Sequence, residues 1–513
     1  MALFVVGLFL LFVGYYFYVG YVERVLAPDK RTTPAISKRD GVDFLVLPTW
    51  KNMLIQLLNI AGVGPVVGAI LGVKFGPIVF VLIPIGNILG GAVHDFVSGM
   101  MSLRAGGASL PLLIRDQLGK YVYRFFLVAM TLILFLVVAV FINTPAALLA
   151  GIPKLDAMGL DFWMFVILIF SYYILATLLP VDKIIGRLYP FFGILLLIGT
   201  ALLFFKLLLL HSEDPAHFMV STAAFRAGLT TQPVIPCLFV TIACGILSGF
   251  HATQSPIVAR TVKSEFDARP VFAGMMVVEG VIAMIWAAAG MAFYTAFPNQ
   301  MSLGGNAALE KITTHFLGNG LGSVTILAVV ILAITTGDTA LRSLRLSLAE
   351  SFKIKQKSLA SRLALTVPLI VVVMGILLWS NSSQDSFQVL WQYFAWGNQC
   401  LAAFTLTAAV VWLYVRKKNY IIALLPAAFI LFIILSFILW TGPERGGPIG
   451  CRLDLRISYR IAAATALVIL TCAVFWAKRL RARGIPQDAL PQSELQQDEQ
   501  PQSELRQSEQ QDK

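Results

Sequence analysis

The sequence predicts an all-α polytopic membrane protein of about 13 transmembrane helices, with a 5+5 inverted-repeat transporter core and peripheral helices. Three observations lead to this fold class. The 513-residue chain is 58% hydrophobic and only 13% charged, with a mean hydropathy of +0.81. Apolar runs of about twenty residues, each long enough to cross a bilayer as a helix, recur from the N-terminus to Trp476. Two helix-breaking clusters lie five spans apart, at matching places in the two halves.

The apolar runs define the expected spans and the organisation of the chain. The thirteen expected spans are residues 3–22, 52–72, 77–98, 125–150, 162–180, 189–210, 233–251, 271–295, 321–340, 363–380, 388–414, 420–441 and 459–476. We expect a peripheral N-terminal helix (1–22), a cytoplasmic loop (23–51), a first repeat of spans 2–6 (52–210), a second repeat of spans 7–11 (233–414), and two peripheral C-terminal helices (420–476). The Gln-, Ser- and Glu-rich end, 477–513, is expected to be a disordered cytoplasmic tail.

The distribution of basic residues predicts the orientation of the chain. The loops after the odd-numbered spans, with the start of the tail, carry 28 Lys and Arg, whereas the loops on the other side carry 7. Because cytoplasmic loops are enriched in these residues, we expect the N-terminus outside and the C-terminus in the cytoplasm. The same bias explains the net charge of +12 without a nucleic-acid partner, so the expected surroundings are the lipid bilayer.

Two stretches combine glycine and proline with polar residues inside apolar spans. Span 2 contains "NIAGVGPVVGAILG" and span 7 ends in "GILSGFHATQSP". Proline and glycine unwind a helix, and in lipid the freed backbone groups are tolerated only beside protein or a polar cavity. Because the spans run in opposite directions, we predict a substrate site between the two breaks. The predicted substrate-binding residues are Gly62, Gly64, Pro65, Ser248, Gly249, Phe250, His251, Gln254 and Ser255. The alternative for each cluster alone is a kink or close helix packing.

Ionisable residues within the spans are candidates for proton or cation coupling, because such residues are costly in lipid. Glu279 lies deep in span 8 with no charged neighbour in the sequence. His94 and Asp95 end span 3, and their alternative is a place in the headgroup layer. Asp338 stands four residues before Arg342, so a structural ion pair at the membrane edge is its alternative.

Two adjacent hydroxyls, Thr335 and Thr336, are oxygen ligands suited to a small cation such as sodium. The alternative is that each hydroxyl bonds back to its own helix. A bound sodium ion is the only cofactor-like species that the sequence suggests. The chain has no H-E-x-x-H, Walker A or nucleophile-elbow motif, so we expect neither an enzyme nor a transporter driven by nucleotide hydrolysis.

The blocks "AGVGPVVGAILG", "GGAVHDF", "CGILSGFHATQSPIVARTVKSE" and "TTGDTALRSLRLSLAE" resemble the carbon starvation protein A family in order and spacing. The resemblance extends from about Pro28 to Trp476 and implies a bacterial cytoplasmic membrane protein that takes up small peptides, or pyruvate in some branches, under carbon limitation. It also implies the five-plus-five repeat of the amino acid–polyamine–cation superfamily. By position, Thr335 and Thr336 match the cation-binding hydroxyls of sodium-coupled members of that superfamily.

The sequence therefore predicts a secondary active, cation-coupled symporter for small peptides or pyruvate-like carboxylates. The choice between these substrates, and between protons and sodium, stays open, and the sequence carries no signal for the oligomeric state. The alternative function is a membrane-embedded nutrient sensor without net transport. A membrane enzyme built on His94 and Asp95 is a third alternative, but it lacks a second catalytic constellation.

Overall fold

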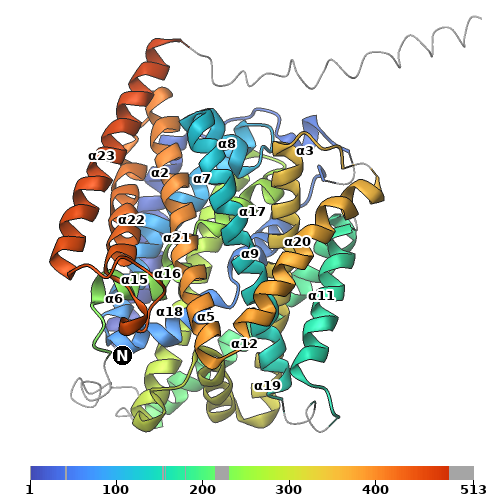
Figure 1. Cartoon of the computed structure of the whole chain (residues 1–513), viewed down its shortest axis with the longest axis vertical. Coiled ribbons are helices and arrows are strands. Elements are labelled where there is room, and N and C mark those ends of the chain that lie inside the picture. Colours follow the sequence, from blue (N-terminus) through green and yellow to red (C-terminus); the bar gives the residue numbers. More distant parts are fainter. Residues whose placement is uncertain are drawn as a thin grey trace, which may run out of the picture.

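A computed structural model describes residues 2–40, 43–152, 155, 158–178, 181–213, 230–356 and 358–484. Within these residues the chain is helical throughout, and its only β-type pairing is an isolated bridge between Leu47 and Val262. The helices form one bundle whose long elements run between the same two ends (Figure 1). The expected tail is outside the described residues from 485 onward.

The helices follow one another from the N-terminus as a peripheral helix, two sets of core helices and a C-terminal pair. Before the core lie α1 (Ala2–Gly14), η1 (Tyr15–Val19), α2 (Gly20–Leu26) and α3 (Pro34–Ser37). The first set is α4 (Thr49–Ile60), α5 (Gly64–Gly72), η2 (Val73–Phe75), α6 (Val79–Gly86), η3 (Asn87–Ala92), α7 (Val93–Arg104), α8 (Leu110–Leu118), α9 (Lys120–Ala150), α11 (Phe162–Leu178) and α12 (Val181–Glu213).

The second set contains the other broken span and the longest helices. It consists of η4 (Val234–Leu238), α15 (Phe239–Thr241), α16 (Ala243–Ile246), α17 (Phe250–Ala259), η5 (Glu265–Asp267), η6 (Arg269–Gly274), α18 (Met275–Ala296), η7 (Pro298–Gln300), α19 (Gly305–Ser351), α20 (Leu359–Ser380) and α21 (Gln384–Val415). The chain continues with α22 (Ile421–Trp440), η8 (Pro443–Arg445) and α23 (Leu455–Ala482). Within α19, Gly318 has a φ of 71°, which only glycine adopts readily, so a short helix and a long helix meet there.

Each of the thirteen expected spans has a counterpart among the described residues. Ten helices are long and apolar enough to cross a membrane, and the pair Thr49–Ile60 and Gly64–Phe75 forms an eleventh span bent by 51°. The shorter apolar helix α11 corresponds to the fifth expected span, and the interrupted series from η4 to α17 corresponds to the seventh. The seventh span runs on to Ala259, beyond the expected end at residue 251, and α23 continues to Ala482, beyond 476.

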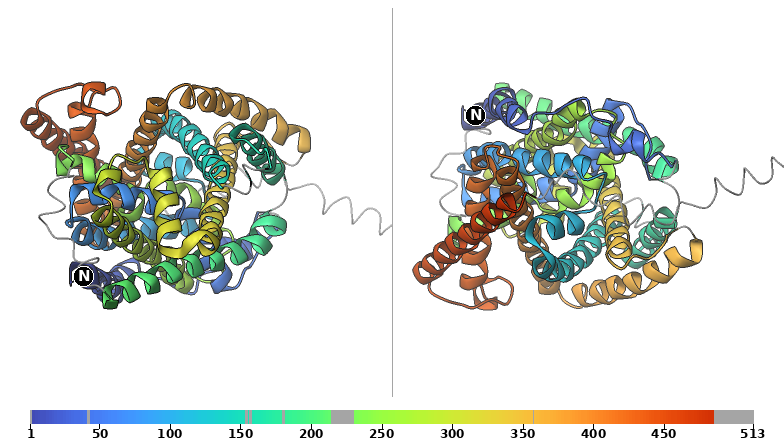
Figure 2. Two further views of the ribbon diagram at one scale, coloured as in Figure 1. Left: turned by 90° about the horizontal axis from the view of Figure 1, so that it is seen from below. Right: turned by 90° about the horizontal axis from the view of Figure 1, so that it is seen from above.

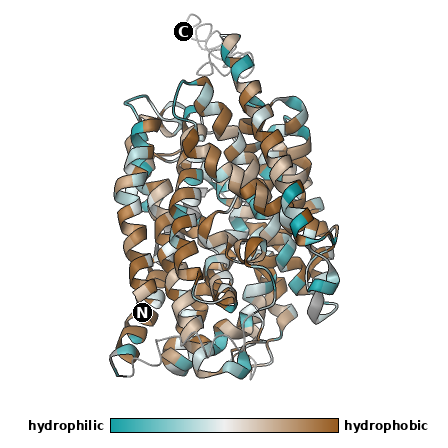
Figure 3. Ribbon diagram, turned by 90° about the vertical axis from the view of Figure 1, so that its left-hand side faces the viewer, coloured by the Kyte–Doolittle hydropathy of each residue, from teal (hydrophilic) through white to brown (hydrophobic). Residues whose placement is uncertain are grey.

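The surface of the bundle is that of a membrane protein. Hydrophobic residues cover the middle of the helices, and hydrophilic residues gather toward both ends (Figure 3). The described chain begins at one end of the bundle, and α23 finishes at the opposite end (Figure 1). The odd number of expected spans requires this placement, although it does not by itself say which end is cytoplasmic.

The two broken spans lie next to each other in the core and run in opposite directions. The first half of span 2, α4, contacts the last half of span 7, α17, while α5 contacts α15 and α16. The peripheral helices lie outside this core: α1 contacts α6 and α18, and α22 and α23 contact each other and α21. Both views of Figure 2 place α22 and α23 at the edge of the bundle.

Candidate functional site

The first break separates α4 from α5 at Ala61, Gly62 and Val63. The ψ of Ala61 is 61°, so the helical hydrogen-bond ladder stops there. The missing side chain of Gly62 matters, since a Cβ atom would lie 2.6 Å from the ring of Phe141 and 3.4 Å from Thr336 Cγ2. Pro65 begins the next helix, where its missing N–H removes no hydrogen bond. The sequence cluster therefore unwinds the span as predicted.

The second break separates α16 from α17 at Leu247, Ser248 and Gly249. Leu247 is extended, with φ −171° and ψ 105°. The freed N–H of Gly249 donates a hydrogen bond to the carbonyl oxygen of Asn398 on α21 at 2.9 Å. A Cβ atom on Gly249 would lie 2.0 Å from the backbone nitrogen of Ala402, so only glycine fits here. Neighbouring protein thus satisfies the broken backbone, as a lipid environment requires.

The two breaks touch through small residues. A Cβ atom on Gly64 would lie 2.2 Å from Cys244 Sγ and 2.5 Å from Cys244 Cβ. One turn further along α5, a Cβ atom on Gly68 would lie 2.7 Å from the carbonyl oxygen of Thr241. The glycines of span 2 therefore let its backbone lie directly against the first half of span 7.

Four titratable side chains from three helices form a buried cluster beside the second break. Asp95 accepts at both carboxylate oxygens: Oδ1 is 2.8 Å from His94 Nδ1, and Oδ2 is 3.0 Å from His251 Nδ1. The other ring nitrogen of His251, Nε2, lies 3.7 Å from Glu279 Oε2. We call these four residues the titratable cluster. It joins α7 to α17 and α18, which lie far from α7 in the sequence.

The titratable cluster is closed to solvent. All four side chains are at most 1% exposed. His94 Nε2, His251 Nε2 and both carboxylate oxygens of Glu279 have no hydrogen-bond partner among the described residues. His94 and Asp95 are 0% exposed, so their side chains contact protein and not the headgroup layer. Glu279, isolated in the sequence, has an imidazole beside it in the fold.

The remaining predicted substrate residues lie around the second break. The Ser255 hydroxyl donates to the carbonyl oxygen of His251 at 3.1 Å and lies 3.2 Å from the Ser98 hydroxyl on α7. Phe250 stacks against Phe141 with a centroid distance of 6.4 Å. Ser248 Oγ and Gln254 Oε1 are buried and have no hydrogen-bond partner among the described residues.

The predicted cation-binding threonines lie on α19, beside the first break. The Thr336 hydroxyl lies 3.0 Å from the carbonyl oxygen of Leu58, near the end of α4, and 3.0 Å from that of Leu332. The Thr335 hydroxyl donates to Leu332 at 2.8 Å. Bonding back to the helix therefore occurs, and Thr336 also reaches the broken span. Among the described residues, no group of three or more His, Cys, Asp or Glu side chains, the titratable cluster included, has an arrangement that could hold a metal ion.

Asp338 is buried further along α19, with 0% of its side chain exposed. Its neighbour Gly337 packs against Tyr173 of α11, whose hydroxyl would lie 2.0 Å from a Cβ atom at Gly337. Tyr173 donates to the carbonyl oxygen of Phe141 at 2.9 Å. The structure thus brings Glu279, His94 and Asp95 together with His251, and it buries Asp338 on α19 beside the residue that packs against Tyr173.

Several buried amide side chains in this region were missed by the sequence reasoning. Asn87 Nδ2 donates to the carbonyl oxygens of Gly245 and Met276, at 3.1 and 2.9 Å, and so ties the second broken span to α18. Gln56 and Asn59 on α4 are 0% exposed. A signal for them was present, because with Asn52 they repeat at positions i, i+4 and i+7 of one otherwise apolar helix.

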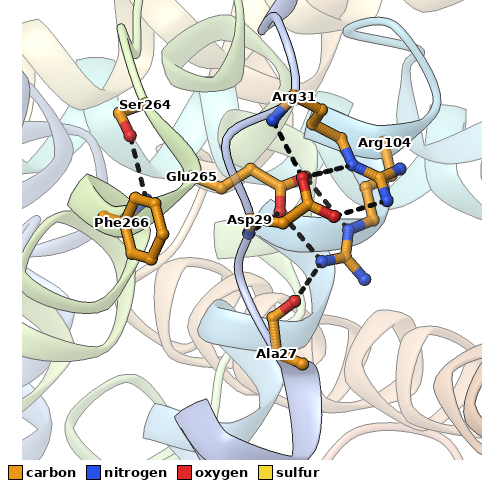
Figure 4. A network of polar contacts seen from close by, with 7 residues as sticks. All are labelled: Ala27, Asp29, Arg31, Arg104, Ser264, Glu265 and Phe266. Atoms are coloured by element: carbon orange, nitrogen blue, oxygen red, sulfur yellow. Dashed lines mark hydrogen bonds and ion pairs between the residues drawn. The ribbon is translucent and has the colours of Figure 1, made fainter.

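A second polar network joins the loop after span 1 to Arg104 and Glu265 (Figure 4). Arg104, the last residue of α7, donates two hydrogen bonds to the Glu265 carboxylate, at 3.0 and 2.8 Å. Asp29 donates its N–H to Glu265 at 3.1 Å, and its carboxylate pairs with Arg31 at 2.8 Å. The Arg31 guanidinium holds the pKa of the Asp29 carboxyl at about 2, below its usual 3.8. The loop after span 1 is thereby fastened to the ends of two core segments.

Two broken helices of opposite direction, packed together beside buried ionisable groups, define a polytopic membrane protein with the inverted-repeat fold of secondary transporters. A crystal structure of the Eremococcus coleocola manganese transporter matches this fold with a TM-score of 0.56 at 13% sequence identity, covering 86% of this chain and 99% of the other.

The chain belongs to the carbon starvation protein CstA family, whose model matches residues 1–165, 153–302 and 295–436. An uncharacterized membrane protein of Haemophilus influenzae is 41% identical over 329 residues, 55% of this chain and 89% of that protein. A peptide transporter CstA of Helicobacter pylori is 30% identical over 343 residues, 53% of this chain and 48% of that protein. The pyruvate/proton symporter BtsT of Escherichia coli is 27% identical over 336 residues, 53% of this chain and 46% of that protein. The matches thus span about half the length of these two transporters.

Proposed function

We propose that this protein is a proton-coupled secondary transporter that takes up small peptides or pyruvate-like carboxylates across the bacterial cytoplasmic membrane. Its N-terminus would face outside and its C-terminus the cytoplasm. The named relatives, a peptide transporter and a pyruvate/proton symporter, support the substrate classes. The loop charges support the orientation.

The observation that carries the proposal is the titratable cluster beside the two breaks. The His251 imidazole lies between two carboxylates, 3.0 Å from Asp95 and 3.7 Å from Glu279. An imidazole can accept a proton at one nitrogen and release one from the other, so the three groups form a path for a proton between α7 and α18.

The burial of the cluster supplies a reason for coupling. Closing the bundle around two ionised carboxylates is costly in a medium of low polarity. A proton taken up by the cluster lowers that cost, so protonation favours the closed conformation. Substrate would bind at the adjacent break, where the N-terminal end of α17 presents partial positive charge to a carboxylate.

Sodium is the alternative driving ion, with Thr335 and Thr336 as its ligands. Sodium is supported by the Thr336 hydroxyl, which lies 3.0 Å from the carbonyl oxygen of Leu58, so an oxygen atom of α19 and one of the first broken span are neighbours. The proton is supported as the driving ion by the four ionisable side chains of the titratable cluster at the second break. The two proposals differ in the gradient that drives uptake.

The test is uptake of labelled pyruvate and labelled dipeptides into proteoliposomes, with proton and sodium gradients imposed separately. We expect accumulation driven by an inward proton gradient and abolished in a His251→Gln variant that still elutes as a folded species on size-exclusion chromatography. Accumulation driven only by sodium would contradict the coupling. No uptake of either substrate under any gradient would contradict transport and favour a sensor.

A further inference from the structure

The face of α4 that carries Asn52, Gln56 and Asn59 points toward the last half of span 7. The side chain of Asn52 makes two hydrogen bonds to Thr261: Nδ2 donates to its carbonyl oxygen at 3.2 Å, and Oδ1 accepts from its hydroxyl at 2.7 Å. Residues at positions i, i+4 and i+7 share one helix face. Gln56 and Asn59 therefore continue the face that Asn52 fixes against span 7.

Gln254 lies on the facing side of α17. Thr261 follows the C-cap residue Arg260, just beyond the end of α17, and Gln254 precedes it by seven residues, about two helical turns. Because Arg260 keeps helical backbone angles, Gln254 and Thr261 lie on the same side of this segment. Because α4 and α17 run in opposite directions, moving from Asn52 to Asn59 on one helix corresponds to moving from Thr261 back to Gln254 on the other. This register sets Gln254 opposite the turn that carries Gln56 and Asn59, between the two breaks.

These three amides have unused hydrogen-bonding capacity. The side-chain oxygen and nitrogen of Gln56 and of Asn59, and the oxygen of Gln254, have no partner among the described residues, and all three residues are 0% exposed. The nitrogen of Gln254 donates to the Thr253 hydroxyl at 2.9 Å. Buried polar groups without partners are destabilising, and apolar residues of similar size would remove that cost. Their presence at the breaks is explained by a ligand that bonds to them when the helices part.

We propose that Gln56, Asn59 and Gln254 form a substrate subsite for a group that both donates and accepts hydrogen bonds, namely an amide such as a peptide bond. This inference rests on the proposed transport function and narrows its substrate. Three amide oxygens need donors and two amide nitrogens need acceptors. The N–H and C=O of a peptide bond satisfy both kinds, whereas an acceptor-only carboxylate such as pyruvate leaves the oxygens unpaired.

The test compares an amide with its ester. The probes are L-alanyl-L-alanine, L-alanyl-L-lactate, in which an ester oxygen replaces the N–H, and pyruvate. Binding to the purified full chain in nanodiscs is measured by calorimetry, and uptake is measured in parallel in proteoliposomes. We expect the amide to bind about tenfold more tightly than the ester, because a site that loses one hydrogen-bonding partner leaves its own group unpaired.

The informative variants are Gln56→Met and Asn59→Leu, which keep the volume and remove the amide. Each is expected to weaken binding of the amide about tenfold and to weaken binding of the ester less, because the ester offers the subsite only an acceptor. Each should leave the melting temperature of the ligand-free protein unchanged or higher. The matched control is Thr200→Val, which removes a buried hydroxyl that has no partner in the described part of the chain, on α12. It should leave all three affinities unchanged.

The outcomes separate this inference from the transport function. Equal binding of amide and ester by the wild-type protein, or equal losses for both in the variants, would overturn the subsite. Uptake of pyruvate without binding of the dipeptide would overturn the subsite and leave transport standing. Selective binding of the dipeptide without uptake under any gradient would support the subsite and overturn transport.

Discussion

Replacing Gly64 by alanine tests the direct contact between the two broken helices. The new Cβ atom would lie 2.2 Å from Cys244 Sγ and 2.5 Å from Cys244 Cβ, whereas real Cβ atoms essentially never come within 3.0 Å of another heavy atom. Rotating the Cys244 side chain moves Sγ but leaves its Cβ in place. The overlap can therefore be relieved only if α5 and α16 move apart.

The expected cost follows from this geometry. Overpacking a core by one methyl group costs about 1–3 kcal/mol, and no strained φ adds to it, because the backbone of Gly64 is not left-handed. We expect Gly64→Ala to lower the melting temperature of the protein in detergent. Unfolding is measured by the change in intrinsic fluorescence on heating. Gly375→Ala is the matched control, because a Cβ atom there meets nothing within 4 Å and alanine is a better helix former than glycine.

Second-site changes at Cys244 make the prediction sharper. Cys244→Gly removes both clashing atoms, so the double variant with Gly64→Ala should melt at a higher temperature than Gly64→Ala alone. Cys244→Ala removes only Sγ and should rescue less. A wild-type melting temperature for Gly64→Ala, or equal effects of the two second-site changes, would refute the packing of the breaks against each other.

Three further predictions concern charged residues. Glu279→Gln keeps the side-chain volume but cannot release a proton. Uptake driven by a pH gradient should therefore fall about tenfold or more, while exchange of substrate at equal pH on both sides persists. Loss of exchange as well would contradict a role of Glu279 in proton coupling. Arg104→Met leaves the Glu265 carboxylate, which is 1% exposed, without its bidentate partner. The free energy of unfolding should fall by about 3 kcal/mol. An unchanged melting temperature would contradict a stabilising role for this ion pair. The Asp29 carboxylate has a pKa of about 2 in the folded protein, against a usual 3.8, so its stabilising effect is complete above pH 3.8 and is lost as the pH falls toward 2. The melting temperatures of wild type and Asp29→Asn should therefore converge only in that range, and convergence near neutral pH would contradict the pairing with Arg31.

The spans and breaks could be predicted because their causes are local. A run of apolar residues fixes a membrane helix wherever it lies in the fold. Glycine and proline unwind a helix through their own backbone properties, so Gly62, Gly64 and Pro65 mark the first break directly. The odd spacing of five spans from span 2 to span 7 predicts their opposite directions. The end of span 7 was less predictable, because α17 continues through Pro256 after the break.

The composition of the site could be predicted only in part, since its groups meet through tertiary contacts. Glu279 has no charged neighbour in the sequence, and its proximity to His251 depends on how α18 packs against α17. His94 and Asp95 had two equally good positions until the burial of α7 was known. The helical spacing of Gln56 with Asn52 and Asn59 is visible in the sequence, but a neutral amide is less costly in an apolar span than an ionised group, so it indicates a site less strongly.

The network at the end of α7 has a consequence for how the bundle responds to ionic strength. It consists of two layers: the Asp29–Arg31 pair is 47% and 39% exposed, while the Glu265–Arg104 pair beneath it is 1% and 6% exposed. Dissolved salt screens exposed charges strongly and buried ones weakly. Added salt should therefore weaken the Asp29–Arg31 pair first and leave the Glu265–Arg104 pair intact. The contacts that hold the loop after span 1 against α7 thus differ in their sensitivity to ionic strength.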